Sequence, residues 1–159
     1  MSLPLWATLI LALPIGMPLS FGQAQDSATL LNLKSEQAHE QSNLDVVMRF
    51  WKDIWEDRKV ELAPKYVAEA YLDHNPNMRN GRDSFMKAFS RPLPTNVLRT
   101  KANTVMTFTK GDMVILIQER EGPDPSDPSK TYKWSWLEMF RLADGLIQEH
   151  WDSSVRRPN

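Results

Sequence analysis

The stretch 131-TYKWSWLEMFRLADGLIQEHWD-152 decides the fold, because it holds two runs of strand-forming residues on either side of a short turn. Residues 131–142 and 146–152 are rich in aromatic and aliphatic side chains, which favour extended backbone. Asp144-Gly145 between them is typical of the tight turn of a β-hairpin. We therefore predict two long antiparallel strands at the C-terminal end of the fold.

The residues upstream of this hairpin predict helices first and strands second. Apolar residues recur every three or four positions from Leu44 to Trp55, which indicates an amphipathic helix with Ser42 or Asn43 as its N-cap. We predict two more helices at 60–72 and 82–90, then strands at 101–108 and 113–121, and a long hairpin connection at 122–129. This order indicates an α+β fold with helices on one face of an antiparallel sheet.

The composition limits the number of domains and the class of partner. The chain has 159 residues, 42% of them apolar, and a net charge of −1, which predicts one globular domain. Near-balanced charge argues against binding to nucleic acid or to an anionic membrane, so we expect a small molecule or a protein as partner. The absence of cysteine excludes disulfides, thiolate metal sites and a cysteine nucleophile.

The N-terminal segment predicts export. Residues 3–19 carry no charge, and Gly22-Gln23-Ala24 places small residues at the −3 and −1 positions of a signal-peptide cleavage site. We predict a signal peptide at 1–24 and a periplasmic or secreted mature protein that has no membrane association after cleavage. Residues 25–43 are polar and predict a leader that is either mobile or a frayed helix.

Several short motifs resemble the SnoaL-like branch of the nuclear transport factor 2-like superfamily. They are Tyr71-Leu72-Asp73-His74-Asn75-Pro76-Asn77, Gly81-Arg82, Phe140-Arg141, Asp144-Gly145 and Gln148-Glu149-His150-Trp151-Asp152. The resemblance covers 44–154 and implies a cone-shaped α+β barrel, with N-terminal helices packed in a curved antiparallel sheet, and a homodimer. Its founding members are polyketide cyclases that use neither metal nor organic cofactor, so it implies none here. Asp73 and Glu138 differ from the residues common at these positions in relatives.

Four residues are candidates for acid–base catalysis, namely His74, His150, Asp152 and Glu138. An imidazole titrates near neutral pH, so a histidine beside a carboxylate can move a proton next to a carbonyl group. A carboxylate such as Glu138, flanked by aromatic residues, would have its pKa raised by desolvation, unless it pairs with an arginine such as Arg120. His74 lies at the end of the second predicted helix. The next residue, Asn75, could stabilise an oxyanion or simply cap the helix.

The length of the hairpin loop decides which residues share a face with Glu138. With a three-residue loop at 143–145, His150 falls opposite Glu138, and Asp152 lies on the same face because it is two residues further along the strand. With a two-residue loop at 144–145, Trp151 and Glu149 join Glu138 instead. Both loop lengths are common, so the sequence leaves both sets open, and we prefer His150 with Asp152.

An apolar pocket with a polar floor is predicted from the aromatic face of the strand at 131–142 and from the helices. We expect it to be lined by Tyr71, Asn75, Phe85, Phe89, Trp134, Trp136 and Trp151. The leading hypothesis is a cofactor-independent enzyme that performs acid–base chemistry, an aldol cyclisation or an isomerisation, on a small apolar carbonyl compound. The alternatives are a non-catalytic domain that binds a small hydrophobic ligand, and a dimeric accessory module that binds a protein. We predict no metal site.

Overall fold

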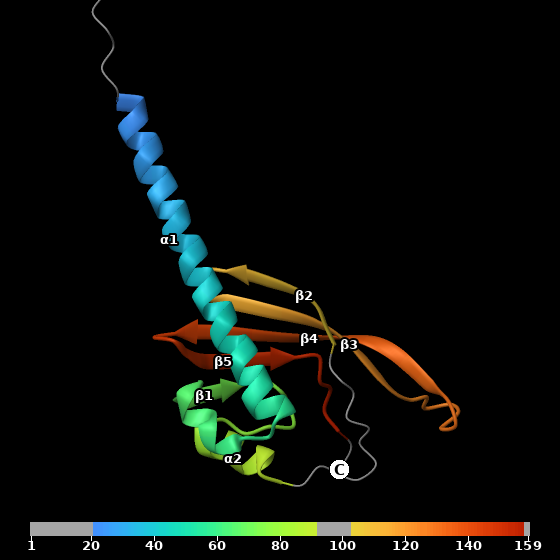
Figure 1. Ribbon diagram of the computed structural model, residues 1–159. Coiled ribbons are helices and arrows are strands. Elements are labelled where there is room, and N and C mark those ends of the chain that lie inside the picture. Colours follow the sequence, from blue (N-terminus) through green and yellow to red (C-terminus); the bar gives the residue numbers. More distant parts are fainter. Residues whose placement is uncertain (1–20, 92–102, 158–159) are drawn as a thin grey trace, which may run out of the picture. The chain divides into compact units, whose positions relative to one another are not determined.

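The computed structural model describes residues 21–91 and 103–157 of the chain (Figure 1). The chain divides into two compact units, 1–33 and 34–159, and the sheet and the candidate site belong to the second. Residues 1–20 of the predicted signal peptide (1–24) lie outside the described residues, so its cleavage stays a prediction. No helix in the described ranges is long and apolar enough to cross a membrane.

The first helix is longer than the sequence pattern predicts. Helix α1 runs from Phe21 to Phe50 and continues as a π-helix, η1, from Trp51 to Glu56. The N-cap predicted at Ser42 or Asn43 is wrong, because both residues lie inside α1, and Asn43 instead donates to the carbonyl of Gly111 at 3.1 Å. The Gln, Glu, Lys and Leu residues of 25–43 are good helix formers, which is why the segment predicted as a leader is helical.

The second predicted helix, 60–72, is wrong for most of its length. A 3₁₀-helix, η2, covers Val60–Lys65, and the chain then forms strand β1, Val67–Asp73. The end of β1 pairs in parallel with strand β5, and the amide of His74 donates to the carbonyl of His150 at 2.8 Å. The open edge of β5 thus supplies backbone partners that outweigh the helix propensity of a segment rich in Ala, Glu and Leu.

The sheet has five strands in the order β1-β5-β4-β3-β2 (Figure 1). The four strands of the predicted meander are confirmed, and they span Asn103–Lys110 (β2), Met113–Pro123 (β3), Thr131–Ala143 (β4) and Leu146–Asp152 (β5). The predicted third helix is also confirmed as α2, Arg82–Phe89. The α+β class is correct, but the sheet is mixed rather than antiparallel because β1 runs parallel to β5.

The two faces of the sheet have different surroundings. The inner face carries Leu116 on β3 and Glu138, Phe140 and Leu142 on β4, all buried, and it packs against the end of α1 and against α2. Phe50 of α1 meets Phe140 edge to face, with ring centroids 5.8 Å apart. The outer face carries the alternate side chains, among them Met106, Phe108, Leu137 and Trp151, which are exposed or only partly buried. A candidate site on the inner face therefore lies at the edge of the core.

Candidate active site

A β-bulge brings His150, Asp152 and Glu138 to the same face of the sheet. The hairpin loop has two residues, since Ala143 pairs with Leu146 and both Asp144 and Gly145 have positive φ, as a tight primed turn requires. That loop length alone would have placed Trp151 with Glu138. The register then shifts by one residue, so that Phe140 pairs with His150 and Glu138 with Asp152. The preferred set is therefore the one that faces inward, together with Glu138.

The extra residue of this bulge is Gln148, which has no partner on β4. Leu142 pairs with Ile147 and Arg141 with Glu149, leaving Gln148 between them. The Gln148 side-chain amide donates to the carbonyl of Ala143 at 3.1 Å, back across the turn. Hydrogen bonding within the turn therefore accompanies the shift that the loop length could not predict.

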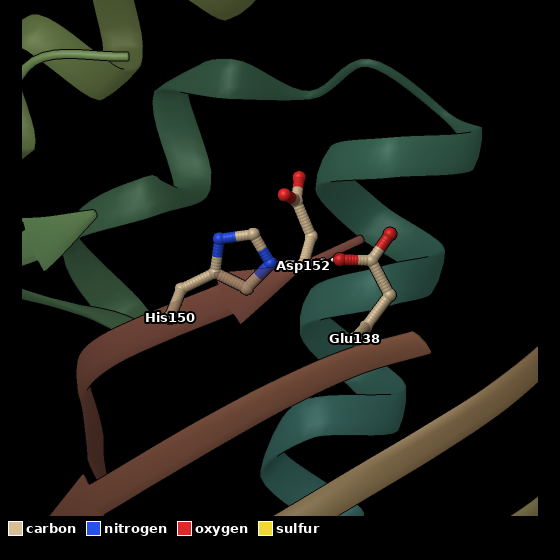
Figure 2. A group of neighbouring side chains, drawn as sticks. All are labelled: Glu138, His150 and Asp152. Carbon is tan, nitrogen blue, oxygen red and sulfur yellow. Dashed lines mark hydrogen bonds and ion pairs between the residues drawn. The ribbon is translucent and has the colours of Figure 1, made fainter. Parts of the chain in front are cut away.

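The imidazole of His150 lies between two buried carboxylates. Its Nε2 is 2.7 Å from Oε2 of Glu138, and its Nδ1 is 3.3 Å from Oδ1 of Asp73. The side chains of Asp73, Glu138 and His150 are 3%, 4% and 13% exposed. Figure 2 shows His150 and Asp152 projecting from β5 beside Glu138 of the adjacent strand. Three strands thus converge on one ring, because Asp73 ends β1, Glu138 lies on β4 and His150 on β5.

Glu138 also forms an ion pair with Arg120, the pairing that the sequence analysis gave as the alternative to a raised pKa. Nη2 of Arg120 is 2.6 Å from Oε1 of Glu138, and the indole N–H of Trp136 donates to the same oxygen at 2.8 Å. The Arg120 guanidinium lies over the Trp136 ring, 4.0 Å from its centroid. Glu138 therefore bridges two cationic groups, Arg120 and the ring of His150.

Asp73 is a partner of His150 that the sequence analysis did not assign to the site. The hydroxyl of Tyr71 donates to its Oδ2 at 3.2 Å, and the amide of Asn75 donates to its Oδ1 at 3.0 Å. Because the sequence predicts a helix at 60–72, it assigns Asp73 to no face of a sheet. The only sequence signal was its difference from the residue common in relatives. Burial and the neighbouring Asp73 carboxylate raise the pKa of the Tyr71 hydroxyl, which keeps it a neutral donor.

Asp152 has a different set of partners from the other two carboxylates. Nδ2 of Asn75 donates to its Oδ2 at 2.7 Å, and the amide of Ser154 donates to its Oδ1 at 2.9 Å. The hydroxyl of Ser154 adds a contact at 3.1 Å. All of these donors are neutral, and Asp152 is only partly buried. It is the carboxylate of the group that lacks a direct cationic partner among the described residues.

The surroundings of His150 stabilise its protonated form. Burial alone lowers the pKa of an imidazole, but the hydrogen bonds to Asp73 and Glu138 outweigh it and raise the pKa of His150 to about 9. The ring is therefore charged at neutral pH, with an N–H directed at each carboxylate. For Arg120, burial is the largest effect and lowers the pKa of the guanidinium despite Glu138, although an arginine remains charged near neutral pH.

His74 is not part of this group, contrary to the sequence prediction. Its Nε2 is 2.9 Å from Oε2 of Glu149, and its ring stacks on Trp151 with centroids 4.3 Å apart. Residues 149 and 151 point to the outer face because side chains alternate along β5. Trp151, predicted to line the pocket, therefore lies on the outer face as well. The backbones of the two histidines are hydrogen-bonded, with the amide of His74 donating to the carbonyl of His150, but their side chains lie on opposite sides of the sheet.

The other predicted pocket residues lie on the inner side or in the core. Asn75 contacts Asp152, and Trp134 and Trp136 follow Glu138 toward the β3–β4 hairpin on the same face of β4. Tyr71 and Phe85 are buried and meet edge to face at 5.6 Å, and Phe89 stacks on Phe85 at 4.4 Å. Phe85 and Phe89 thus pack against other aromatic residues, and a ligand-lining role for them stays a prediction.

Glu138, His150 and Asp152 also offer three potential metal-binding atoms within 4.8 Å of one another. The chemistry of this donor set does not favour a cation. A ligating histidine must be neutral, whereas His150 has a pKa of about 9 and directs both nitrogens at carboxylates. Glu138 is already neutralised by Arg120 at 2.6 Å. The arrangement suits an acid–base group better than a metal site.

The fold of the chain is similar to that of several solved structures. A candidate SnoaL-like polyketide cyclase from Jannaschia sp. CCS1 is similar with a TM-score of 0.56 and 20% identity, covering 72% of this chain and 88% of that one. A nuclear transport factor 2-like protein of unknown function from Burkholderia pseudomallei K96243 matches with a TM-score of 0.55 and 15% identity, over 70% and 88% of the two chains.

A candidate ketosteroid isomerase from Kribbella flavida DSM 17836 is also similar, with a TM-score of 0.55 and 10% identity, over 76% of this chain and 84% of that one. Neither a protein-family model nor a curated protein sequence matches the chain. The chain therefore has the nuclear transport factor 2-like fold of the SnoaL-like proteins, as the sequence motifs predicted.

Proposed function

We propose that the protein is an exported, cofactor-independent enzyme that removes a proton next to the carbonyl group of a small apolar compound. One observation supports it above the others: a protonated His150 is held between Asp73 and Glu138, with the carboxylate of Asp152 beside it. A buried cation next to a carboxylate base is what enolate chemistry needs, since negative charge develops on the carbonyl oxygen as the proton leaves. The fold hosts proteins described as cyclases and isomerases, but chemistry must come from the site.

Asp152 is the proposed proton acceptor. Glu138 and Asp73 accept hydrogen bonds from charged His150, and Glu138 also from Arg120, so their charge is already balanced. Among residues 21–91 and 103–157, only Asn75 and Ser154 donate hydrogen bonds to Asp152, which remains partly accessible. His150 itself is protonated at neutral pH, so it acts through its positive charge rather than as the base. This refines the role that the sequence assigned to the His–carboxylate group.

The experiment that tests this function follows α-proton exchange. Wild-type protein without added cofactor is incubated with a small cyclic ketone, such as 2-tetralone, in D₂O, and loss of the α-proton signal is followed by NMR. Asp152→Asn should slow exchange by about 10²–10⁴-fold, the usual contribution of a positioned base. Asp144→Asn makes the same chemical change in the hairpin turn, where asparagine tolerates the positive φ, and should leave the rate unchanged. Equal rates for the two variants would exclude Asp152 as the base.

The outer face of the sheet supports a second proposal, that the protein forms a homodimer. Met106 and Phe108 on β2 and Leu137 on β4 are about half exposed, and Ile117 of the intervening strand β3 pairs with both Met106 and Leu137. Contiguous apolar patches of this kind mark interaction surfaces. A two-fold pairing of the same face on two copies would cover the patch without requiring another partner.

Export rests on the N-terminal segment alone. If residues 1–24 are a signal peptide, expression of the full chain in a secreting host should give a mature protein whose N-terminus is Gln25. Intact mass of the secreted protein measures this, and a protein that still begins at Met1 would overturn the export proposal.

A further inference from the structure

Three buried N–H groups of the second unit lack an acceptor. They are Nε1 of Trp51, Nε2 of Gln118 and Nε of Arg120, and none has a hydrogen-bond partner within 21–91 or 103–157. Gln118 is fully buried and Trp51 nearly so. Buried donors in native proteins are almost always paired, because leaving one unpaired forfeits its hydration. Three in one region therefore need an explanation.

The three donors belong to one neighbourhood on the inner side of the sheet. Gln118 and Arg120 are two apart on β3 and share a face, and Oε1 of Gln118 is 3.4 Å from Nη2 of Arg120. The ring of Trp51 stacks on Trp55 at 5.0 Å, and Trp55 in turn lies 5.6 Å from the Arg120 guanidinium carbon. The donors thus come from η1 and β3, with Trp55 between them.

The helix that supplies Trp51 is itself unusual. Trp51 and Trp55 belong to the π-helix η1, a rare conformation that frequently occurs at functional sites. Trp55 is partly exposed, whereas Trp51 beneath it is buried. Trp55 is therefore the exposed ring that contacts both Trp51 and the Arg120 guanidinium.

We propose that Gln118, Arg120 and Trp51 form a donor subsite that binds a neutral carbonyl oxygen of the ligand after Trp55 moves aside. A carbonyl oxygen has two lone pairs and can accept hydrogen bonds from two N–H groups at once. Arg120 joins this subsite to the acid–base group, because its Nη2 contacts Glu138 while its Nε is free of any partner in the described chain. The proposal deepens the proposed function, on which its choice of a carbonyl ligand rests.

Charge favours a neutral carbonyl over a carboxylate. Arg120 is balanced by Glu138, His150 is balanced by Asp73, and Asp152 leaves the group with one net negative charge. A second uncompensated anion buried beside Arg120 would be repelled, whereas a ketone, ester or amide oxygen adds none. The subsite therefore selects for acceptor oxygens without formal charge.

Binding of three matched probes tests the subsite. The probes are 1-indanone, the hydrocarbon indane and indane-1-carboxylate, titrated into the mature full-length protein and followed by ¹H–¹⁵N NMR. Wild-type protein should bind the ketone at least tenfold more tightly than either other probe. The indole N–H of Trp51 and the side-chain amide of Gln118 should shift downfield only with the ketone, because only the bound ketone brings an acceptor oxygen to these donors.

Two variants and a control assign the effect. Gln118→Leu keeps the volume and removes an unpaired buried amide, so it should fold and should bind the ketone about tenfold more weakly. Trp51→Phe removes the other neutral donor and should also weaken ketone binding, which keeps the test available if Gln118→Leu fails to fold. Gln41→Leu makes the first change on an exposed part of α1, where the Gln41 amide donates to Asp45, and should bind as wild type.

The opposing results are specific. Equal binding of ketone and indane, tighter binding of the carboxylate, no ketone binding at millimolar concentration, or unchanged ketone affinity in both donor variants would overturn the subsite. Selective ketone binding without α-proton exchange would leave the subsite standing and remove the enzymatic proposal. Wild-type α-proton exchange, together with a ketone affinity that is unchanged in Gln118→Leu and Trp51→Phe, would keep the enzymatic proposal and remove the subsite.

Discussion

The two histidines of the fold show how strongly the side of a sheet decides the chemistry of a residue. His150 on the inner face is buried between two carboxylates and has a pKa of about 9. His74 on the outer face also meets one carboxylate, Glu149, at 2.9 Å, but its side chain is 41% exposed and stacks on Trp151. The same pair of groups is thus a strongly coupled ion pair in one place and a solvent-screened contact in the other.

Replacing each histidine with alanine should give the largest difference in stability between the two faces. His150→Ala leaves Asp73 and Glu138 buried with fewer partners, so the free energy of unfolding should fall by about 3–5 kcal/mol. His74→Ala removes a half-exposed contact and should cost at most about 1 kcal/mol. Urea unfolding followed by tryptophan fluorescence measures both. Similar losses for the two variants would contradict the difference between the faces.

The stability of the wild-type protein should depend on pH through His150. Its folded-state pKa of about 9 lies above the ordinary histidine value of 6.5, so the protonated ring stabilises the fold. That contribution is fully present below pH 6.5 and is lost as the pH rises through about 9, a decrease on the order of 3 kcal/mol. Urea unfolding at half-unit pH steps measures it. His74→Ala should keep the same slope, and a flat profile from pH 6.5 to 9 would refute the assignment.

A charge on the outer face should weaken the proposed dimer. Phe108→Lys places an ammonium group in the apolar patch with Met106 and Leu137, and the dimer dissociation constant should rise at least tenfold, about 1.4 kcal/mol. Sedimentation equilibrium measures the constant. Val155→Lys is the control, because Val155 is 81% exposed and lies after the end of β5, outside the patch. A wild-type protein that is monomeric at all concentrations would rule the dimer out.

The bulge residue should have the smallest effect. Gln148→Ala removes the side-chain hydrogen bond to the Ala143 carbonyl and should lower the free energy of unfolding by about 1 kcal/mol. The pKa of His150, followed by NMR of its ring protons, should not change, since backbone pairing of Phe140 with His150 holds the register. A shifted His150 pKa would mean that the Gln148 side chain itself sets the register.

The candidate site could be predicted in part because its residues repeat with the period of a strand. Alternation along 146–152 placed His150 and Asp152 on one face, and the preferred alternative proved to be the inward one. The sequence left open whether Glu138 shares its face with this pair or with Trp151, and the structure joins it to the pair. Trp151 belonged to the alternative register, which the bulge removes, and His74 was assigned to the acid–base group from the family motif, which carries no information about the face of a sheet.

The sequence by itself determined β2 to β5, α2 and the α+β class, because strand alternation, helical spacing and the Asp144-Gly145 turn are local signals. Only the tertiary structure decided that Val67–Asp73 is a strand, since its hydrogen bonds come from β5, 75 or more residues away along the chain. It also decided the bulge at Gln148 and the meeting of Asp73, Glu138 and His150. Pairing between distant segments fixes β1 and the position of Asp73, and no short window of sequence contains both partners. The bulge lies within the β4–β5 hairpin, where the sequence is compatible with either register.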